Sequence, residues 1–274
     1  MQNLRKYGNE PFKVAVIHGG PGAPGEMAPV ARELSSIKGI LEPLQTATTV
    51  EGQVKELKAV LEKNAEFPVT LIGFSWGALL SLIFAARYPS FVKKLILVGS
   101  APYEEKYASK IMETRMSRLG EKERNEAISL MKALNNPAAK NKHSLMLRLG
   151  TLISKADSYD PMPHEDEILE CQHEVYQRVW EQAQELRSSG NLLELGKKIQ
   201  CPVVAIHGDY DPHPAEGVKE PLSHTLKDFR FILLEKCGHR PWLERSARNK
   251  FYDILKEESW ERPKHAWKPT RRIH

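Results

Sequence analysis

Four short segments of this 274-residue chain carry residues whose types and spacing could do chemistry. A serine stands between two glycines in "GFSWG" at 73–77, an aspartate lies in "GDYDP" at 208–212, and a histidine lies in "GHRPW" at 238–242. A glycine-rich segment, "HGGPG", occupies 18–22. A hydroxyl, a carboxylate and an imidazole, in the chain order Ser, Asp, His, are the groups that nucleophilic catalysis combines.

The sequence around Ser75 predicts a sharp turn from a strand into a helix. The run "PVTLIG" at 68–73 is rich in strand-forming residues, and "WGALLSLIFAARY" at 76–88 is typical of a buried helix. Side chains two residues before and after a nucleophile on such a turn must be very small, and Gly73 and Gly77 meet that demand. The turn also places the hydroxyl at a helix N-terminus, whose unpaired N–H groups favour negative charge. The alternative role for Ser75 is an ordinary helix N-cap.

His239 is the candidate general base, because it follows the last predicted strand. It would take the proton of Ser75 and later return it to the leaving group. Two carboxylates compete for the role of the acid that orients this imidazole. Asp211 is favoured over Asp209, since it lies well past the preceding strand and is followed by a proline that fixes the loop. Asp209 is then expected to be a hydrogen-bonding residue of the loop.

The "HGGPG" segment lacks the GxGxxG spacing and the following lysine that phosphate-binding loops use. We expect it instead to donate a backbone N–H to an oxyanion. The N–H of Gly20 and that of Trp76, the residue after the nucleophile, would act together. His18 is expected to brace the loop rather than to act chemically, and Gly19 to shape it.

The sequence predicts no metal site and no cofactor. Four potential ligands cluster in one stretch, namely His207, Asp209, Asp211 and His213. They lie on an irregular loop, however, and lack the spacings that zinc sites usually have. The expected chemistry therefore needs only protein side chains and a small-molecule substrate.

These segments need a scaffold that brings the ends of strands together. Strand-like and helix-like runs alternate along the chain, which predicts an α/β protein with a mostly parallel sheet between helices. In such a sheet the carboxyl ends of the strands form one edge, where functional residues gather. The predicted strands are 12–17, 39–45, 68–73, 92–100, 201–208 and 229–238, and the predicted core helices are 26–36, 49–64, 76–88 and 242–258.

Residues 101–200 interrupt this alternation with helical stretches only. The four stretches are roughly 103–119, 121–135, 138–155 and 164–188. A helical block inserted into an α/β pattern predicts a cap over one edge of the sheet. Asp157 and Asp160 lie in this block and are therefore poor candidates for the acid. The predicted organisation is an α/β core of 1–100 and 201–258, a cap of 101–200, and a basic C-terminal tail of 259–274.

Composition argues against several classes of protein. The net charge is +5, but most of it comes from the last fifteen residues, so the rest of the chain is close to neutral and nucleic acid is not expected as a partner. The first residues lack the apolar run of a signal peptide, and no stretch is long and apolar enough to span a membrane. We therefore expect a cytoplasmic protein without a membrane partner. Its assembly into a homo-oligomer is compatible with the sequence.

With "HGGPG", "GFSWG", "GDYDP" and "GHRPW" in this order, the chain resembles the α/β-hydrolase superfamily, in its serine-nucleophile branch. The resemblance implies an α/β-hydrolase fold with Ser75 as nucleophile, Asp211 as acid and His239 as base. "HGGPG" together with "SWG" is most similar to the proline iminopeptidase group. Compared with that group, the chain begins almost at the strand before the oxyanion loop. The first antiparallel strands are therefore expected to be absent, which leaves a sheet of about six strands.

The expected function is a cofactor-independent serine hydrolase that cleaves a small-molecule ester, thioester, lactone or amide through an acyl-enzyme. An aminopeptidase of the proline iminopeptidase type is the alternative among enzymes. That group binds the substrate amine through acidic residues of the cap, and several acidic residues lie at 165–185 here. A hydrolase-like receptor that binds a ligand without turnover is the alternative from a different class.

Overall fold

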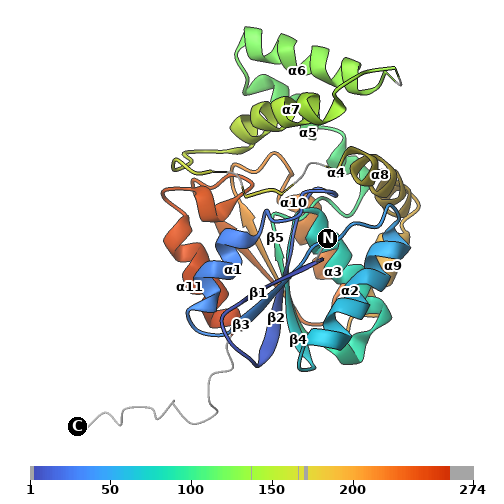
Figure 1. The fold of residues 1–274 in the computed structure, drawn as a ribbon, viewed down its shortest axis with the longest axis vertical. Helices are drawn as coiled ribbons and strands as arrows, with labels where there is room; N and C mark the ends of the chain where they lie inside the picture. The colour runs from blue at the N-terminus through green and yellow to red at the C-terminus, as the bar shows by residue number, and fades with distance from the viewer. Residues whose placement is uncertain (1–2, 137, 166, 170–171, 260–274) are drawn as a thin grey trace, which may run out of the picture.

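A seven-stranded sheet forms the centre of the protein (Figure 1). The computed structural model describes residues 3–136, 138–165, 167–169 and 172–259. The strands lie in the order β1-β3-β2-β4-β5-β6-β7, and all neighbouring pairs are parallel except β1 and β3. Their bounds are β1 (Leu4–Tyr7), β2 (Phe12–Ile17), β3 (Gly39–Pro43), β4 (Val69–Phe74), β5 (Val92–Val98), β6 (Val203–Gly208) and β7 (Phe229–Leu234).

Helices cover both faces of the sheet, as the alternation of the sequence predicts. Figure 1 shows α1 and α11 on one side and α2, α3 and α9 on the other. Successive strand residues point to opposite faces, so Val14 and Val16 pack with α1 and α11, whereas Ala15 and Ile17 pack with the opposite group. The bounds are α1 (Ala28–Ser35), α2 (Val50–Asn64), α3 (Trp76–Arg87), α9 (Asn191–Gly196), α10 (Glu216–Thr225) and α11 (Arg248–Ser259), with short 3₁₀ turns η1 (Pro89–Phe91) and η2 (Pro241–Leu243). In the described part of the chain, none of the helices combines the length and the apolar character that crossing a membrane requires.

The sheet has one strand more than the sequence led us to expect. The additional strand is β1, which pairs antiparallel with β3 at the edge of the sheet, from Leu4↔Pro43 to Tyr7↔Ile40. Its sequence LRKY has two cations among four residues, and none of the four is buried. No apolar run therefore marks it as a strand, and only its pairing with β3 defines it.

Six helices lie between β5 and β6 in the described residues. The predicted stretch 103–119 forms two short helices instead of one. Helices α5, α6 and α7 project beyond the sheet (Figure 1) and share an apolar cluster of their own, whereas α8 buries Val175 and Val179 in the main core. The 101–200 boundaries of a cap stay a prediction, and all of the basic tail except Ser259 lies outside the described residues. The remaining bounds are α4 (Glu105–Ala108), α5 (Ile111–Ser117), α6 (Glu121–Leu134), α7 (Lys142–Asp157) and α8 (His173–Ser188).

The turn between β4 and α3 has a strained backbone at Ser75, whose φ is 51° and ψ is −113°. The contacts around this turn show why glycines flank the serine. A Cβ on Gly73 would lie 2.2 Å from the carbonyl oxygen of Gly77, and a Cβ on Gly77 would lie 2.2 Å from that of Ile17. The end of β2, the end of β4 and the start of α3 are thus in direct backbone contact.

We predict that Gly73→Ala lowers the free energy of unfolding by about 2 kcal/mol or more, because the added methyl group has to displace backbone rather than a flexible side chain. Gly150→Ala is the matched control. Nothing lies within 4 Å of a Cβ at that helical position, so we expect no loss and a small gain in helix propensity. Urea unfolding followed by circular dichroism measures both. Equal midpoints for Gly73→Ala and the wild type would contradict the close packing of the turn.

Candidate active site

The sheet brings the four predicted segments to one edge. "HGGPG" follows β2, Ser75 follows β4, Asp211 follows β6 and His239 follows β7. Strands β2, β4, β5, β6 and β7 are neighbours in that order, and all run parallel. Their carboxyl ends therefore lie side by side, and residues from distant parts of the sequence meet there.

Asp211 and His239 form a buried hydrogen-bonded pair. His239 Nδ1 lies 2.7 Å from Asp211 Oδ2, and the two side chains are 10% and 0% exposed. An ionised carboxylate only accepts hydrogen bonds, so Nδ1 carries a proton, and in the neutral form of such a ring Nε2 is the acceptor. This is the tautomer that a general base at Nε2 requires.

The Asp211 carboxylate is held ionised by the histidines around it. Burial alone would raise its pKa, but the nearby imidazoles of His239, His213 and His207 outweigh burial and lower the pKa well below its usual value. His213 contributes two contacts to Oδ1, from its Nδ1 at 2.7 Å and from its backbone N–H at 2.9 Å. The carboxylate is therefore negatively charged at neutral pH.

Asp209 occupies a different place on the same loop. Its side chain is exposed, and Oδ1 accepts a hydrogen bond from the backbone N–H of Cys237 at 3.1 Å. Asp209 thus links the loop after β6 to the loop after β7. Asp209 is thus a hydrogen-bonding residue of the loop, and Asp211 is the carboxylate that contacts His239.

Residues next to the Ser75 turn contact the His239 ring. The Ser75 N–H donates to the Val98 carbonyl at 2.9 Å, and a Cβ on the next residue, Gly99, would lie 3.1 Å from His239 Nδ1. The rings of Phe74 and His239 are also in contact, with centroids 4.7 Å apart. Within the described parts of the chain, no hydrogen bond joins Ser75 Oγ to His239. Catalytic hydrogen bonds often tighten only when a substrate is bound.

His18 ties the "HGGPG" loop to the segment after β3. Its Nδ1 donates to the Gly19 carbonyl at 2.8 Å, and its Nε2 accepts the Gln45 N–H at 3.2 Å. Burial lowers the pKa of His18 to about 4, so the ring is neutral, as these two contacts require. The next glycine, Gly20, has a φ of 104°. Because Gly77 also touches the carbonyl of His18, the loop is held beside the N-terminus of α3.

Asp157, the last residue of α7, uses its backbone to contact the loop that carries His239 (residues 235–240, the histidine loop). Its carbonyl accepts the N–H of His239 at 2.8 Å. Its carboxylate forms a bidentate ion pair with Arg115 of α5, with both N···O distances 2.7 Å. The carboxylate of Asp157 is thus engaged by Arg115, and its carbonyl fixes the backbone of His239. No pattern in the sequence signals this role, because the contact runs through a carbonyl that every residue has.

Glu244 is a second buried carboxylate near His239, at a position that no sequence pattern marks. It is 1% exposed and accepts three backbone N–H groups, those of Gly238 at 3.0 Å, Tyr159 at 2.9 Å and Asp160 at 2.8 Å. These bonds join the histidine loop to the segment that follows α7. The backbone of Gly238 and His239 is thus linked to the helical insertion, directly through Asp157 and by way of the Glu244 carboxylate.

Asp211, His213 and His239 also form a group that could bind a metal ion. One ligand atom from each lies within 4.8 Å of the others, and all three residues are buried. In the structure both imidazoles use Nδ1 to bond the carboxylate. The hydrogen bonds account for the arrangement of these residues without a metal.

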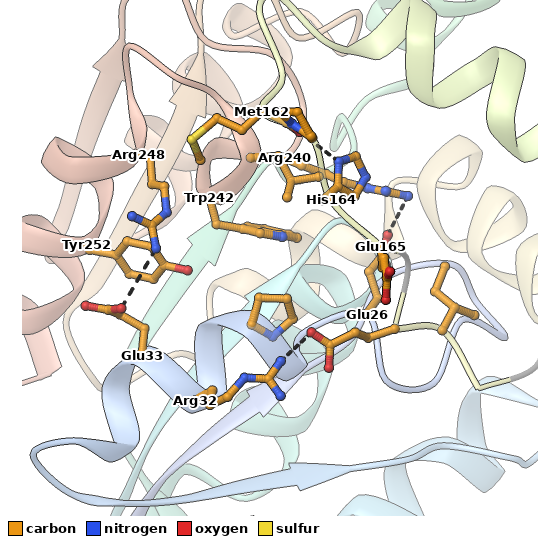
Figure 2. A pocket seen from close by; sticks show the side chains of 15 residues that line it. Glu26, Arg32, Glu33, Met162, His164, Glu165, Arg240, Trp242, Arg248 and Tyr252 are labelled. Carbon is orange, nitrogen blue, oxygen red and sulfur yellow. Dashed lines mark hydrogen bonds and ion pairs between the residues drawn. The ribbon is translucent and has the colours of Figure 1, made fainter.

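A cavity of about 670 Å³ adjoins the histidine loop. Figure 2 shows its lining, which comes from α1, the segments 162–165 and 167–168, η2 and α11, with Trp242 and Arg240 among the residues that line it. Neither Ser75, nor Asp211, nor His239 lines it. Its arginines are paired with carboxylates, namely Arg32 with Glu167, Arg240 with Glu26 and Arg248 with Glu33. The cavity is therefore separate from the predicted catalytic residues, and much of its charge is internally balanced.

Comparison with known proteins places this architecture in a family. The family described as alpha/beta hydrolase fold matches residues 21–246. Monoacylglycerol lipase ABHD6 of Bos taurus is 26% identical over 199 residues, which make up 72% of this chain and 57% of that protein. The chain thus spans little more than half of the length of this curated relative.

Two solved structures resemble the whole fold. The structure of VinJ has a TM-score of 0.63 at 17% identity, with 93% of both chains covered. Proline iminopeptidase of Mycobacterium smegmatis has a TM-score of 0.60 at 16% identity, also with 93% of both chains covered. At these identities the likeness concerns the fold alone.

This chain belongs to the α/β-hydrolase family. The predicted fold class is confirmed.

We predict that the protein loses stability as the pH falls from about 6.5 to about 4. Burial lowers the pKa of both His18 and His213 to about 4 in the folded protein, whereas an unfolded histidine keeps a pKa of about 6.5. Between these values the unfolded chain binds protons that the folded chain does not. The free energy of unfolding therefore decreases as the pH is lowered, by roughly 2 kcal/mol per histidine from pH 7.5 to pH 5.

Urea unfolding at several pH values measures this loss. His18→Gln should reduce the pH dependence, whereas His143→Gln, at an exposed position, should leave it as in the wild type. A wild type and a His18→Gln variant with the same pH dependence would show that burial of His18 does not contribute.

Proposed function

We propose that this protein is a cofactor-independent serine hydrolase that cleaves a small-molecule ester, thioester, lactone or amide through an acyl-enzyme. Ser75 is the nucleophile, His239 the base and Asp211 the acid of a catalytic triad. The observation that carries the proposal is the buried 2.7 Å pair of Asp211 and His239 beside a serine held at φ 51°. A strained serine at a strand-to-helix turn next to an oriented imidazole is the arrangement that activates a hydroxyl.

The first half of the proposed reaction forms the acyl-enzyme. His239 Nε2 removes the proton as Ser75 Oγ attacks the carbonyl carbon of the substrate. The ionised Asp211 stabilises the imidazolium that results. The backbone N–H groups of Gly20 and Trp76 hold the oxyanion, and Trp76 is suited to this because it is the first residue of α3 and its N–H has no acceptor within the helix. The imidazolium then protonates the leaving group.

The second half returns the enzyme to its starting state. His239 removes a proton from a water molecule, which attacks the acyl carbon. The tetrahedral intermediate uses the same two N–H groups and collapses to release the acid, while the His239 imidazolium returns the proton to Ser75 Oγ. His18 keeps the oxyanion loop in place through its bonds to Gly19 and Gln45.

An acyl ester is the substrate class that the relatives favour. The similar protein of Bos taurus is named a monoacylglycerol lipase, so its own substrate is an ester of a fatty acid. Aromatic residues of α8 add an apolar surface on the insertion, where Tyr176 and Trp180 stack with ring centroids 6.4 Å apart. Location in the cytoplasm and the absence of nucleic-acid and membrane partners stay predictions.

The aminopeptidase alternative requires free carboxylates that could bind the substrate amine. Two of the candidate acids are already paired, Glu167 with Arg32 and Glu174 with Arg178. Two others, Asp166 and Glu170, lie outside the described residues. Relative rates on aryl amides of proline and on nitrophenyl acyl esters separate this alternative from the ester hydrolase.

We expect a fluorophosphonate to label the wild type stoichiometrically, and the wild type to turn over a nitrophenyl acyl ester many times. Ser75→Ala should lose both properties and keep the wild-type circular dichroism spectrum. Labelling and turnover require an activated hydroxyl, which alanine lacks. Retained turnover in Ser75→Ala would reject the assignment, whereas labelling of the wild type without turnover would favour a receptor.

Asp211→Asn should lower kcat by several orders of magnitude, roughly 10⁴-fold at other triads, because the amide favours the wrong tautomer of the histidine. Asp209→Asn is the matched control on the same loop. The Asp209 side chain accepts a hydrogen bond from the backbone N–H of Cys237 and does not contact His239 in the described residues. We therefore expect Asp209→Asn to lower kcat far less. Steady-state kinetics on the same ester measures both. The reverse order of severity would assign the acid to Asp209.

A further inference from the structure

Two imidazoles hydrogen-bond the Asp211 carboxylate, and a third, that of His207, has its Nε2 3.5 Å from Oδ2. His239 Nδ1 lies 2.7 Å from Oδ2, and His213 Nδ1 lies 2.7 Å from Oδ1. The two rings are themselves in contact, with centroids 4.5 Å apart. A triad needs only one of these imidazoles, so the second one requires an explanation.

The contacts of His213 define where its proton lies. Burial lowers the pKa of His213 to about 4, so the ring carries a single proton at neutral pH. Because Nδ1 faces an ionised carboxylate, the proton is on Nδ1 and the side chain donates to Asp211. His207 contacts the backbone of the same residue, with its Nε2 2.8 Å from the His213 carbonyl oxygen. His213 is therefore a fixed neutral donor to the carboxylate.

A second donor changes what the carboxylate offers to His239. Negative charge that is stabilised by the N–H of His213 is less available to stabilise an imidazolium on the other oxygen. We propose that His213 is a positioning residue of the reaction, which sets the basicity of His239 through the carboxylate that they share. The inference rests on the proposed function, since it assigns His239 as the base.

The other charged groups around His239 and His213 have partners of their own. Arg115 is paired with Asp157, Glu244 accepts three backbone N–H groups, and Arg240 is paired with Glu26. None of these contacts involves the His213 side chain. A substitution of His213 therefore acts on His239 through Asp211 and through the direct contact of the two rings, which His213→Phe keeps.

Two kinds of variant separate a role in tuning from a role in packing. His213→Phe keeps a ring against His239 but has no donor, and His213→Leu is a second variant without a donor. In His213→Asn the side-chain amide can take the place of Nδ1 and donate to Asp211. The measurement is the pH dependence of kcat/KM for a nitrophenyl acyl ester, whose acid limb reports the base of the free enzyme.

We expect the acid limb to move to higher pH, by about one unit, in both His213→Phe and His213→Leu. Without the second donor, the carboxylate stabilises the imidazolium more strongly, so the base becomes protonated at a higher pH. In His213→Asn the limb should stay close to its wild-type position. A lower rate with an unmoved limb in the variants without a donor would overturn the inference and leave His213 a packing residue.

Proton NMR of the wild type tests the same inference if His213→Phe and His213→Leu do not fold. Proton NMR should show two downfield imidazole Nδ1–H signals, one of which is lost in His213→Asn. A single downfield signal in the wild type, unchanged in that variant, would also overturn the inference. Failure of the proposed function looks different, because then the wild type itself neither turns over the ester nor is labelled at Ser75.

Discussion

The structure of the site depends on a close approach of three backbone segments. Gly77 at the start of α3 touches the carbonyl of Ile17 at the end of β2, and Gly73 at the end of β4 touches the carbonyl of Gly77. No side chain fits between these segments, so their relative positions are fixed by hard contact. The same contact forces Ser75 into its strained conformation and holds the "HGGPG" loop against the helix N-terminus. Ser75, the proposed nucleophile, and the predicted oxyanion donors are therefore positioned by one packing constraint rather than by separate ones.

Around the base, order comes from buried carboxylates with several donors each. Asp211 accepts hydrogen bonds from two imidazoles and one backbone N–H, and Glu244 accepts three backbone N–H groups. Burying a charge is costly unless hydrogen bonds compensate for it, and both sites supply that compensation. Each carboxylate consequently fixes the loops that provide its donors. His239 is held through its ring by one such group and through its neighbour Gly238 by the other.

Much of this could be predicted from the sequence, because the informative residues are constrained locally. The spacing of Gly73, Ser75 and Gly77 reflects contacts within a single turn, and the alternation of strands and helices implies that strand ends meet at one edge. Strand β1 was not predicted, because two cations among its four residues hide the strand pattern. The contacts of Asp157, Glu244 and the His213 side chain were not predicted either, since they join segments whose distance in space the sequence does not specify. Backbone carbonyls and N–H groups carry no residue-specific signal at all.

The bond from the Asp157 carbonyl to the His239 N–H has a consequence for how such proteins diversify. A helical insertion that packed against the core without bonds to the site could be replaced as a separate module. Here the last residue of α7 and the segment just after it are bonded to the histidine loop. A graft from another hydrolase would have to bring its own equivalent of residues 157–160 and match them to a glutamate at 244. The insertion and the loop that carries His239 would thus have to be exchanged together, although Asp157 and His239 are 82 positions apart in the sequence.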